Sequence, residues 1–506
     1  MHGIEITSPQ PADHQITASE NRLAYTNSTH NKSKIYKALS ANLPLFIAFG
    51  SMAAGGILKQ IVTAGISENA AELSALTGLI TGGIIPIETG VFNIMLSEVF
   101  KLRDTLYYEP SRIGSIYQVN LLACLGFVLL SYPFMASAPA ILNASYLDLG
   151  ISDIDMASIQ SCLNWNYATS ILNAMYVADL LLYFQSRNLA SAAISVFLGE
   201  ILDVAICYLL LRHTGLGLSS SAISDFVASA VALMVSKCIQ TGTIPTILKS
   251  TFPSMAQYEL FNFNKESRAR WPEIANKLFR SGALPWVASL SENITGAYSN
   301  IAFSSIGLQG ALSVMQSACN NITGVILLSS SPYIAETDSI PSRKQAITKQ
   351  FIGCMLPNLL VLGIGMAIPN QLSSAMGGKS MSSLTESQLR ANIGLVMTGG
   401  LIANLLSVMY ETFIDCSNTN WPSIIVIAGA FLSVGLDYAF ANGVDSSEVG
   451  NYSLLMSSLA TTLALTTYYC VKDSTYCSRP ASTAAVLAFN KSKQTDLSTN
   501  LLENAA

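Results

Sequence analysis

The stretch SGALPWVASLSENITGAYSNIAFSSIGLQGALSVMQSACNNITG, residues 281–324, contains two long apolar runs separated by a glycine-containing break. Each run approaches the roughly 20 residues that a helix needs to cross a hydrocarbon core of about 30 Å. An earlier stretch, ANLPLFIAFGSMAAGGILKQIVTAGISENAAELSALTG, residues 41–78, has the same plan. Both begin near Leu-Pro and continue with small residues before the break. The pair indicates that the chain duplicates a membrane-spanning unit, which is the usual construction of secondary transporters.

The rest of the chain repeats this apolar pattern. Of its 506 residues, 51% are hydrophobic and 11% are charged, against roughly 25% charged in soluble domains. We therefore predict an all-α integral membrane protein with about twelve transmembrane helices. The expected spans are residues 38–63, 71–100, 114–136, 157–186, 189–211, 217–241, 275–302, 307–336, 345–370, 388–416, 421–440 and 449–472.

The spans fall into two equal groups, which predicts two six-helix lobes at residues 38–241 and 275–472. Residues 242–274 are polar and basic, and we expect them to form a cytoplasmic linker. Residues 1–37 and 473–506 are polar, and we expect both to be disordered tails. Most of the 26 Lys and Arg residues fall in loops that this map places on one side. By the positive-inside rule, both termini are predicted to be cytoplasmic.

Three features carry a resemblance to a known family: the two-lobe layout, residues 281–324, and the segment RNLASAAISVFLGEILDVAICYLLLRHTGLG, residues 187–217. The two segments are similar to the seventh and eighth helices and to the fifth helix of the multidrug and toxic compound extrusion (MATE) transporters. These belong to the polysaccharide and lipid exporter (MOP) superfamily, and the resemblance covers about residues 36–472.

The resemblance implies a V-shaped bundle whose two lobes rock around a cavity. It also implies an H⁺- or Na⁺-coupled antiporter in the plasma or inner membrane that exports organic cationic or amphipathic molecules. The N-terminal half departs from the family pattern. Lys59 stands where relatives often carry an acid, and Gly199 replaces the fifth-helix Asn, although Asp203 is kept.

Charged residues within spans are the candidate site residues, because each costs at least about 2.5 to 3.5 kcal/mol at the centre of a span. Glu292 lies two helical turns after Pro285, and therefore on the same helix face. In the family, a glutamate at this position is associated with cation or proton coupling. Glu411 and Asp415 share a face of the tenth span, and Glu411 matches the acid that the family often places opposite the seventh helix.

The first lobe carries a second group of candidates. Lys59 and Asp203 could form a buried salt bridge that removes a cation site, or Lys59 could extend to the headgroups without a role. Glu88 follows a proline in a glycine-rich span and is another candidate cavity acid. Pro44 and Pro285 are expected to break their helices, which would leave backbone groups open to water or an ion.

Some intramembrane residues fit a structural role better. Asp179 and Asp437 are expected to lie at helix interfaces. Tyr176, Tyr298 and methionines such as Met315 could contact organic ligands, although packing between helices explains them at least as well.

Several other functions are disfavoured. The nine cysteines lack metal-ligand spacing, so no metal and no cofactor beyond a coupling ion is expected. The chain is not expected to be an enzyme, since its four histidines build no catalytic constellation and no phosphate-binding loop is present. The expected partners are a small-molecule substrate and membrane lipids, with no nucleic acid and a monomeric chain.

Two further transport functions stay open. A flippase of the same superfamily would carry a lipid-linked or saccharide substrate, but lipid phosphates call for several basic residues in the cavity. A major-facilitator transporter also has twelve helices, but its Asp-Arg-x-Gly-Arg element is absent between the second and third spans. A chain that has lost transport is a third possibility, because the first lobe is altered.

Overall fold

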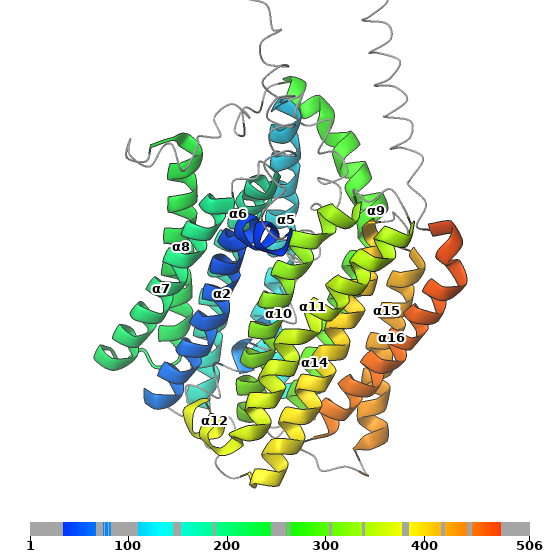
Figure 1. The fold of residues 1–506 in the computed structure, drawn as a ribbon. Coiled ribbons are helices and arrows are strands. Elements are labelled where there is room, and N and C mark those ends of the chain that lie inside the picture. The colour runs from blue at the N-terminus through cyan, green and yellow to red at the C-terminus, as the bar shows by residue number, and fades with distance from the viewer. Residues whose placement is uncertain are drawn as a thin grey trace, which may run out of the picture. The chain divides into compact units, whose positions relative to one another are not determined.

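The computed structural model is helical, without strands, over the residues that it describes (Figure 1). These are residues 34–66, 74, 76–78, 80–81, 110–144, 153–185, 189–243, 260, 263, 265–302, 306–335, 340–376, 384–415, 420–441, 443 and 448–476. The helices are α2 (Lys34–Ile66), α5 (Pro110–Ala144), α6 (Asp153–Gln185), α7 (Leu189–His213), α8 (Ser219–Thr241), α9 (Lys265–Ala302), α10 (Ile306–Ala335), α11 (Ile340–Ala367), α12 (Pro369–Met376), α14 (Glu386–Asp415), α15 (Asn420–Phe440) and α16 (Val449–Tyr476).

Every predicted span except residues 71–100 coincides with one of these helices. The excepted span is described only at residues 74, 76–78 and 80–81, which are helical, so the count of twelve stays a prediction. Among the described residues, seven helices contain a stretch long and apolar enough to cross a membrane. These stretches are Phe46–Ile66, Ile113–Ala138, Ala190–His213, Ser219–Thr241, Thr348–Ala367, Glu386–Leu406 and Asn420–Phe440.

Helix α9 begins at Lys265, before the predicted start of its span, so the end of the segment predicted as a linker is helical. The linker itself stays a prediction. The start of α9 is anchored by Trp271, whose Nε1 donates a hydrogen bond to Oε1 of Gln118 on α5 over 3.1 Å. Pro44 and Pro285 do not break their helices, because α2 and α9 both continue through them. A proline removes one backbone donor, and a helix buried among neighbours tolerates that loss.

The helices after Pro44 pack in two groups. Residues Leu45–Ala506 form one compact unit, and the start of α2 up to Pro44 belongs to a separate one. Within the larger unit, α5, α6, α7 and α8 pack against one another, and α9, α10, α11, α14, α15 and α16 form the second group (Figure 1). The α2 residues Ala48, Phe49 and Met52 contribute to a cluster with α6 and α7.

The two groups touch through α5 and α9. Phe127 on α5 stacks on Trp286 of α9, with ring centroids 4.9 Å apart. Earlier on α5, Gln118 Nε2 donates to the carbonyl of Leu260, a residue that precedes α9, over 3.0 Å. Helix α2 also reaches α12, because Gln60 Nε2 donates to the carbonyl of Met376 over 3.1 Å.

Candidate functional site

A cavity of about 820 Å³ lies between the two groups of helices. Residues of α2, α7 and α8 line one side, and residues of α9, α10, α14 and α16 line the other. Of the site residues predicted from sequence, Lys59, Asp203 and Glu292 line this cavity. Glu200 and Asp225 line it too. The volume is within the range of about 300 to 1,000 Å³ that is typical of small-molecule sites.

Lys59 is paired with acids on the α7 and α8 side of the cavity. Its Nζ lies 2.9 Å and 3.0 Å from the two carboxylate oxygens of Asp203. It lies 2.6 Å from Oδ1 of Asp225 and donates to the carbonyl oxygen of Ser221 over 3.0 Å. The Lys59 and Asp203 side chains are only 12% and 11% exposed. Of the two arrangements left open for Lys59, the salt bridge is therefore the one present.

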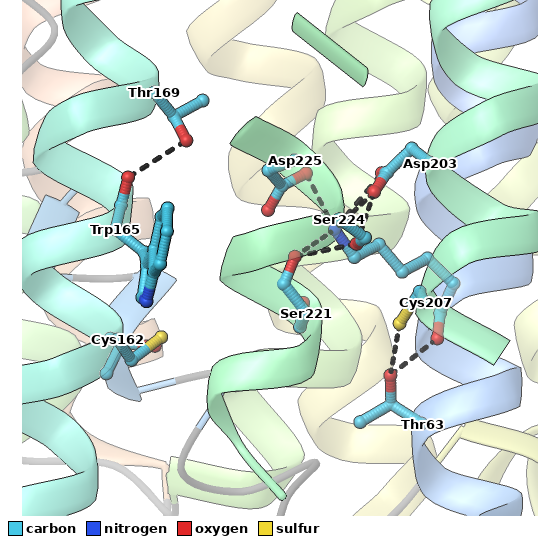
Figure 2. A network of polar contacts seen from close by, with 11 residues as sticks. Thr63, Cys162, Trp165, Thr169, Asp203, Cys207, Ser221, Ser224 and Asp225 are labelled. Atoms are coloured by element: carbon cyan, nitrogen blue, oxygen red, sulfur yellow. Dashed lines mark hydrogen bonds and ion pairs between the residues drawn. The ribbon is translucent and has the colours of Figure 1, made fainter. Parts of the chain in front are cut away.

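The Lys59 cluster, consisting of Lys59, Asp203, Ser221, Ser224 and Asp225, joins three helices. Figure 2 shows Ser221, Ser224 and Asp225 on α8 facing Asp203 on α7. Ser224 Oγ donates to Asp203 Oδ1 over 2.5 Å, so this carboxylate is also fixed from α8. The ammonium group has three hydrogens to donate, and the acceptors on Asp203, Asp225 and Ser221 account for them. Lys59 is therefore saturated within the protein.

Asp225 is a site residue that the sequence analysis missed. It lies close to the start of α8, in a serine-rich stretch that reads as the polar end of a span. The usable signal was spacing, since Ser221 and Asp225 are four residues apart and share a helix face. The Asp225 side chain is 41% exposed, so it meets the cavity as well as Lys59.

Glu200 faces the same side of the cavity because α2 carries a glycine opposite it. A Cβ atom added at Gly55 would lie 2.2 Å from Oε2 of Glu200. The absence of a side chain at Gly55 therefore makes room for the carboxylate between α2 and α7. Glu200 and Asp203 lie three residues apart on α7 and therefore share a helix face.

Glu292 is the only carboxylate among the described residues that line the α9 side of the cavity. Its side chain is exposed there. Among the described residues, no hydrogen bond or ion pair joins its carboxylate. Glu411 and Asp415 belong to α14, but their side chains lie outside the described residues, as does all of Glu88. The expected pairing of Glu292 with Glu411 stays a prediction.

Amides are the most frequent polar side chains on the α9 side of the cavity. Gln309 Nε2 donates to Asn300 Oδ1 over 2.6 Å and to Asn451 Oδ1 over 3.0 Å. Asn451 Nδ2 donates in turn to Asn392 Oδ1 over 2.8 Å. On the next turns of α10, Gln316 Nε2 donates to Asn320 Oδ1 over 2.8 Å. We call the cavity-lining members of these chains, Asn300, Gln309, Gln316, Asn320 and Asn451, the amide wall.

The amide wall was also missed, although its signal is visible in the sequence. Polar residues recur every three or four positions along α10, at Gln309, Ser313, Gln316 and Asn320. This spacing places them on one helix face. All four line the cavity.

The other intramembrane candidates lie away from the cavity. Asp179 is fully buried and pairs with Lys237 on α8, and it also accepts a hydrogen bond from the Tyr117 hydroxyl over 2.9 Å. Asp437 is fully buried and accepts a hydrogen bond from Ser299 Oγ over 2.5 Å. Both join helices. Neither is among the residues that line the cavity.

The aromatic and methionine candidates pack or pair between helices as well. The Tyr176 hydroxyl lies 2.7 Å from Ser195 Oγ, and that of Tyr298 lies 2.7 Å from the Tyr438 hydroxyl. Met315 is buried in the core between α10 and α14. None of these three residues is among those that line the cavity.

Comparison with known proteins gives a fold. No family model and no curated protein matches this sequence. The eukaryotic MATE transporter AtDTX14 superposes with a TM-score of 0.67 at 12% identity, over 86% of this chain and 95% of that one. A mutant of the Vibrio cholerae MATE transporter VcmN gives a TM-score of 0.62 at 13% identity, over 87% of this chain and 98% of that one.

A third similar structure is a MOP superfamily transporter from Pyrococcus furiosus, described as having a binding pocket of reverse polarity that suggests a different function. It gives a TM-score of 0.65 at 11% identity, over 87% of this chain and 96% of that one. Identities this low establish the fold alone. The chain has the fold of the MATE and MOP superfamily transporters, which confirms the predicted all-α, multi-pass membrane architecture.

Proposed function

We propose that this chain, having the fold of the MATE transporters, is a secondary active antiporter that exports small organic cations in exchange for H⁺ or Na⁺. The observation that carries the proposal is the charge of the cavity. Among the described residues, its wall holds four acids, Glu200, Asp203, Asp225 and Glu292, and a single basic residue, Lys59. Unbalanced acids within a membrane protein favour a cationic partner.

The two sides of the cavity suit different steps of antiport. The Lys59 cluster already contains its cation, because the ammonium group is fixed between two carboxylates. Glu292 has no such partner among the described residues. We therefore assign the exchange of a proton or Na⁺ to Glu292. If substrate and coupling ion compete for this carboxylate as the two groups of helices rock, their transport becomes linked.

The alternatives fit this cavity less well. A flippase for a lipid-linked substrate would need to hold anionic phosphate groups, and Lys59 is already saturated by protein acceptors. A major-facilitator transporter would have a different fold from the one observed. We propose that both termini are cytoplasmic, in keeping with the charge distribution. We also propose that the protein is a monomer in the plasma or inner membrane, as in the sequence-based expectation.

The test is gradient-driven flux in proteoliposomes. Purified protein is reconstituted, a proton or sodium gradient is imposed in turn, and movement of a panel of organic cations is followed for the wild type, Glu292→Gln and Glu386→Gln. Glu386 is a matched control, since it is an exposed acid at the start of α14 that pairs with Arg390. We expect driven flux in the wild type and the control, and at least a tenfold loss in Glu292→Gln.

Two outcomes would count against the proposal. Driven flux that survives in Glu292→Gln would remove the coupling role from this residue. A folded wild-type protein that moves no cation under either gradient would overturn cation antiport altogether.

A further inference from the structure

The lining of the cavity has an unusual composition for a site that takes organic cations. Of the described lining residues, eight are Asn or Gln, and six are Ser or Thr. Phe, Tyr, Trp and His are absent from this described lining, and Met52 is its one methionine. Recognition of lipophilic cations typically uses aromatic faces, and recognition of varied apolar ligands uses flexible methionines. This part of the wall offers hydrogen bonds instead.

The amide wall also contains two buried acceptors that have no partner among the described residues. Gln309 is only 4% exposed, and both hydrogens of its amide are used by Asn300 and Asn451. Its Oε1 has no partner among the described residues, and neither does Oε1 of Gln316. A buried acceptor without a hydrogen bond is unfavourable. Both residues line the cavity, so a rotation of their amides toward it would let a bound molecule donate hydrogen bonds to these oxygens.

The position of Gln316 depends on a glycine in the facing helix. A Cβ atom at Gly400 of α14 would lie 1.9 Å from Oε1 and 2.2 Å from Nε2 of Gln316. The amide therefore lies directly against the backbone of α14, in a place that any side chain at position 400 would fill. This close approach fixes a hydrogen-bonding group beside the cavity.

From this lining we infer that the substrate is a hydrophilic amine, meaning a small molecule with at least one ammonium group and several hydroxyl or amide groups. This inference rests on the proposed function and names its substrate class. The ammonium group pairs with the cavity carboxylates, Asp225 and Glu292 being the two with exposed side chains. The hydroxyl groups bond to the amide wall. A lipophilic cation would displace water from these amides without replacing its hydrogen bonds, which loses affinity.

The test uses binding to the full-length protein in detergent, without any gradient. Isothermal titration is carried out with three probes: the β1,4-linked glucosamine dimer, cellobiose and tetraphenylphosphonium. The first two have the same ring framework, but the glucosamine dimer carries ammonium groups where cellobiose carries hydroxyl groups. The third is an aromatic lipophilic cation. We expect the glucosamine dimer to bind at least tenfold more tightly than either of the other two.

Variants then locate the contact. Gln309→Leu and Gln316→Leu should each weaken binding of the glucosamine dimer at least tenfold. Gln371→Leu should leave it unchanged, since Gln371 is an exposed residue of α12 outside the cavity lining. If either Leu variant fails to fold, Gly400→Ala probes the same wall through the Gln316 amide, and a comparable loss is expected.

The possible outcomes separate this inference from the proposed function. Tighter binding of tetraphenylphosphonium, or binding of the glucosamine dimer that the wall variants leave unchanged, would overturn the inference even if gradient-driven cation export is observed. Cellobiose binding as tightly as the dimer would overturn the requirement for an amine. Selective binding of the dimer without driven flux would support the substrate class while contradicting antiport.

Discussion

The two sides of the cavity handle polar groups in opposite ways. On the α7 and α8 side, the one lysine is bound by acids of the protein, and Lys59 joins α2 to both helices through Asp203 and Asp225. On the α9 side, Glu292 has no counterion among the described residues, and neutral amides are the most frequent polar side chains. A charge that is satisfied by neighbouring helices, as Lys59 is, therefore serves mainly to hold those helices together. A polar group that lacks such a partner is available to a ligand.

The largest expected effect comes from removing the shared cation. Lys59→Met leaves two carboxylates near each other without their counterion, and breaking a buried ion pair in this way costs about 3 to 5 kcal/mol. We expect a correspondingly lower free energy of unfolding, measured by denaturation of the purified protein in detergent. Lys59→Arg keeps the positive charge, and we expect a smaller decrease in its free energy of unfolding.

Adding Asp203→Asn to Lys59→Met tests whether the unpaired acids cause the loss of stability. The second change removes one of the two unpaired acids, so part of the lost stability should return. A Lys59→Met protein as stable as the wild type would show that the Lys59 cluster does not hold α2 to α7 and α8.

A smaller effect is expected where α2 makes room for Glu200. The added methyl group of Gly55→Ala would overlap Oε2 of Glu200. Overpacking typically costs about 1 to 3 kcal/mol, and the lower part of this range applies because the end of a flexible side chain can move. Gly50→Ala on the same helix is the control, since a Cβ there meets nothing within 4 Å. Equal stability of the two variants would argue against a close approach of α2 and α7.

The smallest effect on stability is expected on the other side of the cavity. Glu292→Gln removes a charge that has no partner among the described residues, so the free energy of unfolding should stay within about 0.5 kcal/mol of the wild type. The same denaturation experiment measures it. A loss as large as that of Lys59→Met would mean that Glu292 is held by an ion pair, and the contrast between the two sides would disappear.

Part of the site could be predicted from sequence because the relevant signal is local. Lys59, Asp203 and Glu292 stand out as charges within apolar runs, and all three line the cavity. Asp225 was missed because it lies near the start of a span, where acids are ordinary. The amide wall was missed because neutral polar residues cost less within a span and attract less attention. Its periodicity along α10 was nonetheless present.

By itself, the sequence determined the helical membrane architecture, because hydropathy and span length are properties of contiguous residues. Only the tertiary structure decided which polar groups meet. The partner of Lys59 lies 144 residues away, and the packing of α2 against α7 and α8 selected the salt bridge over extension to the headgroups. The structure likewise decided that Tyr176 and Met315 pack between helices and that Tyr298 pairs with Tyr438, while amides line the cavity. The physical reason is that helix rotation and packing, set by contacts between distant segments, determine which face of each helix is turned inward.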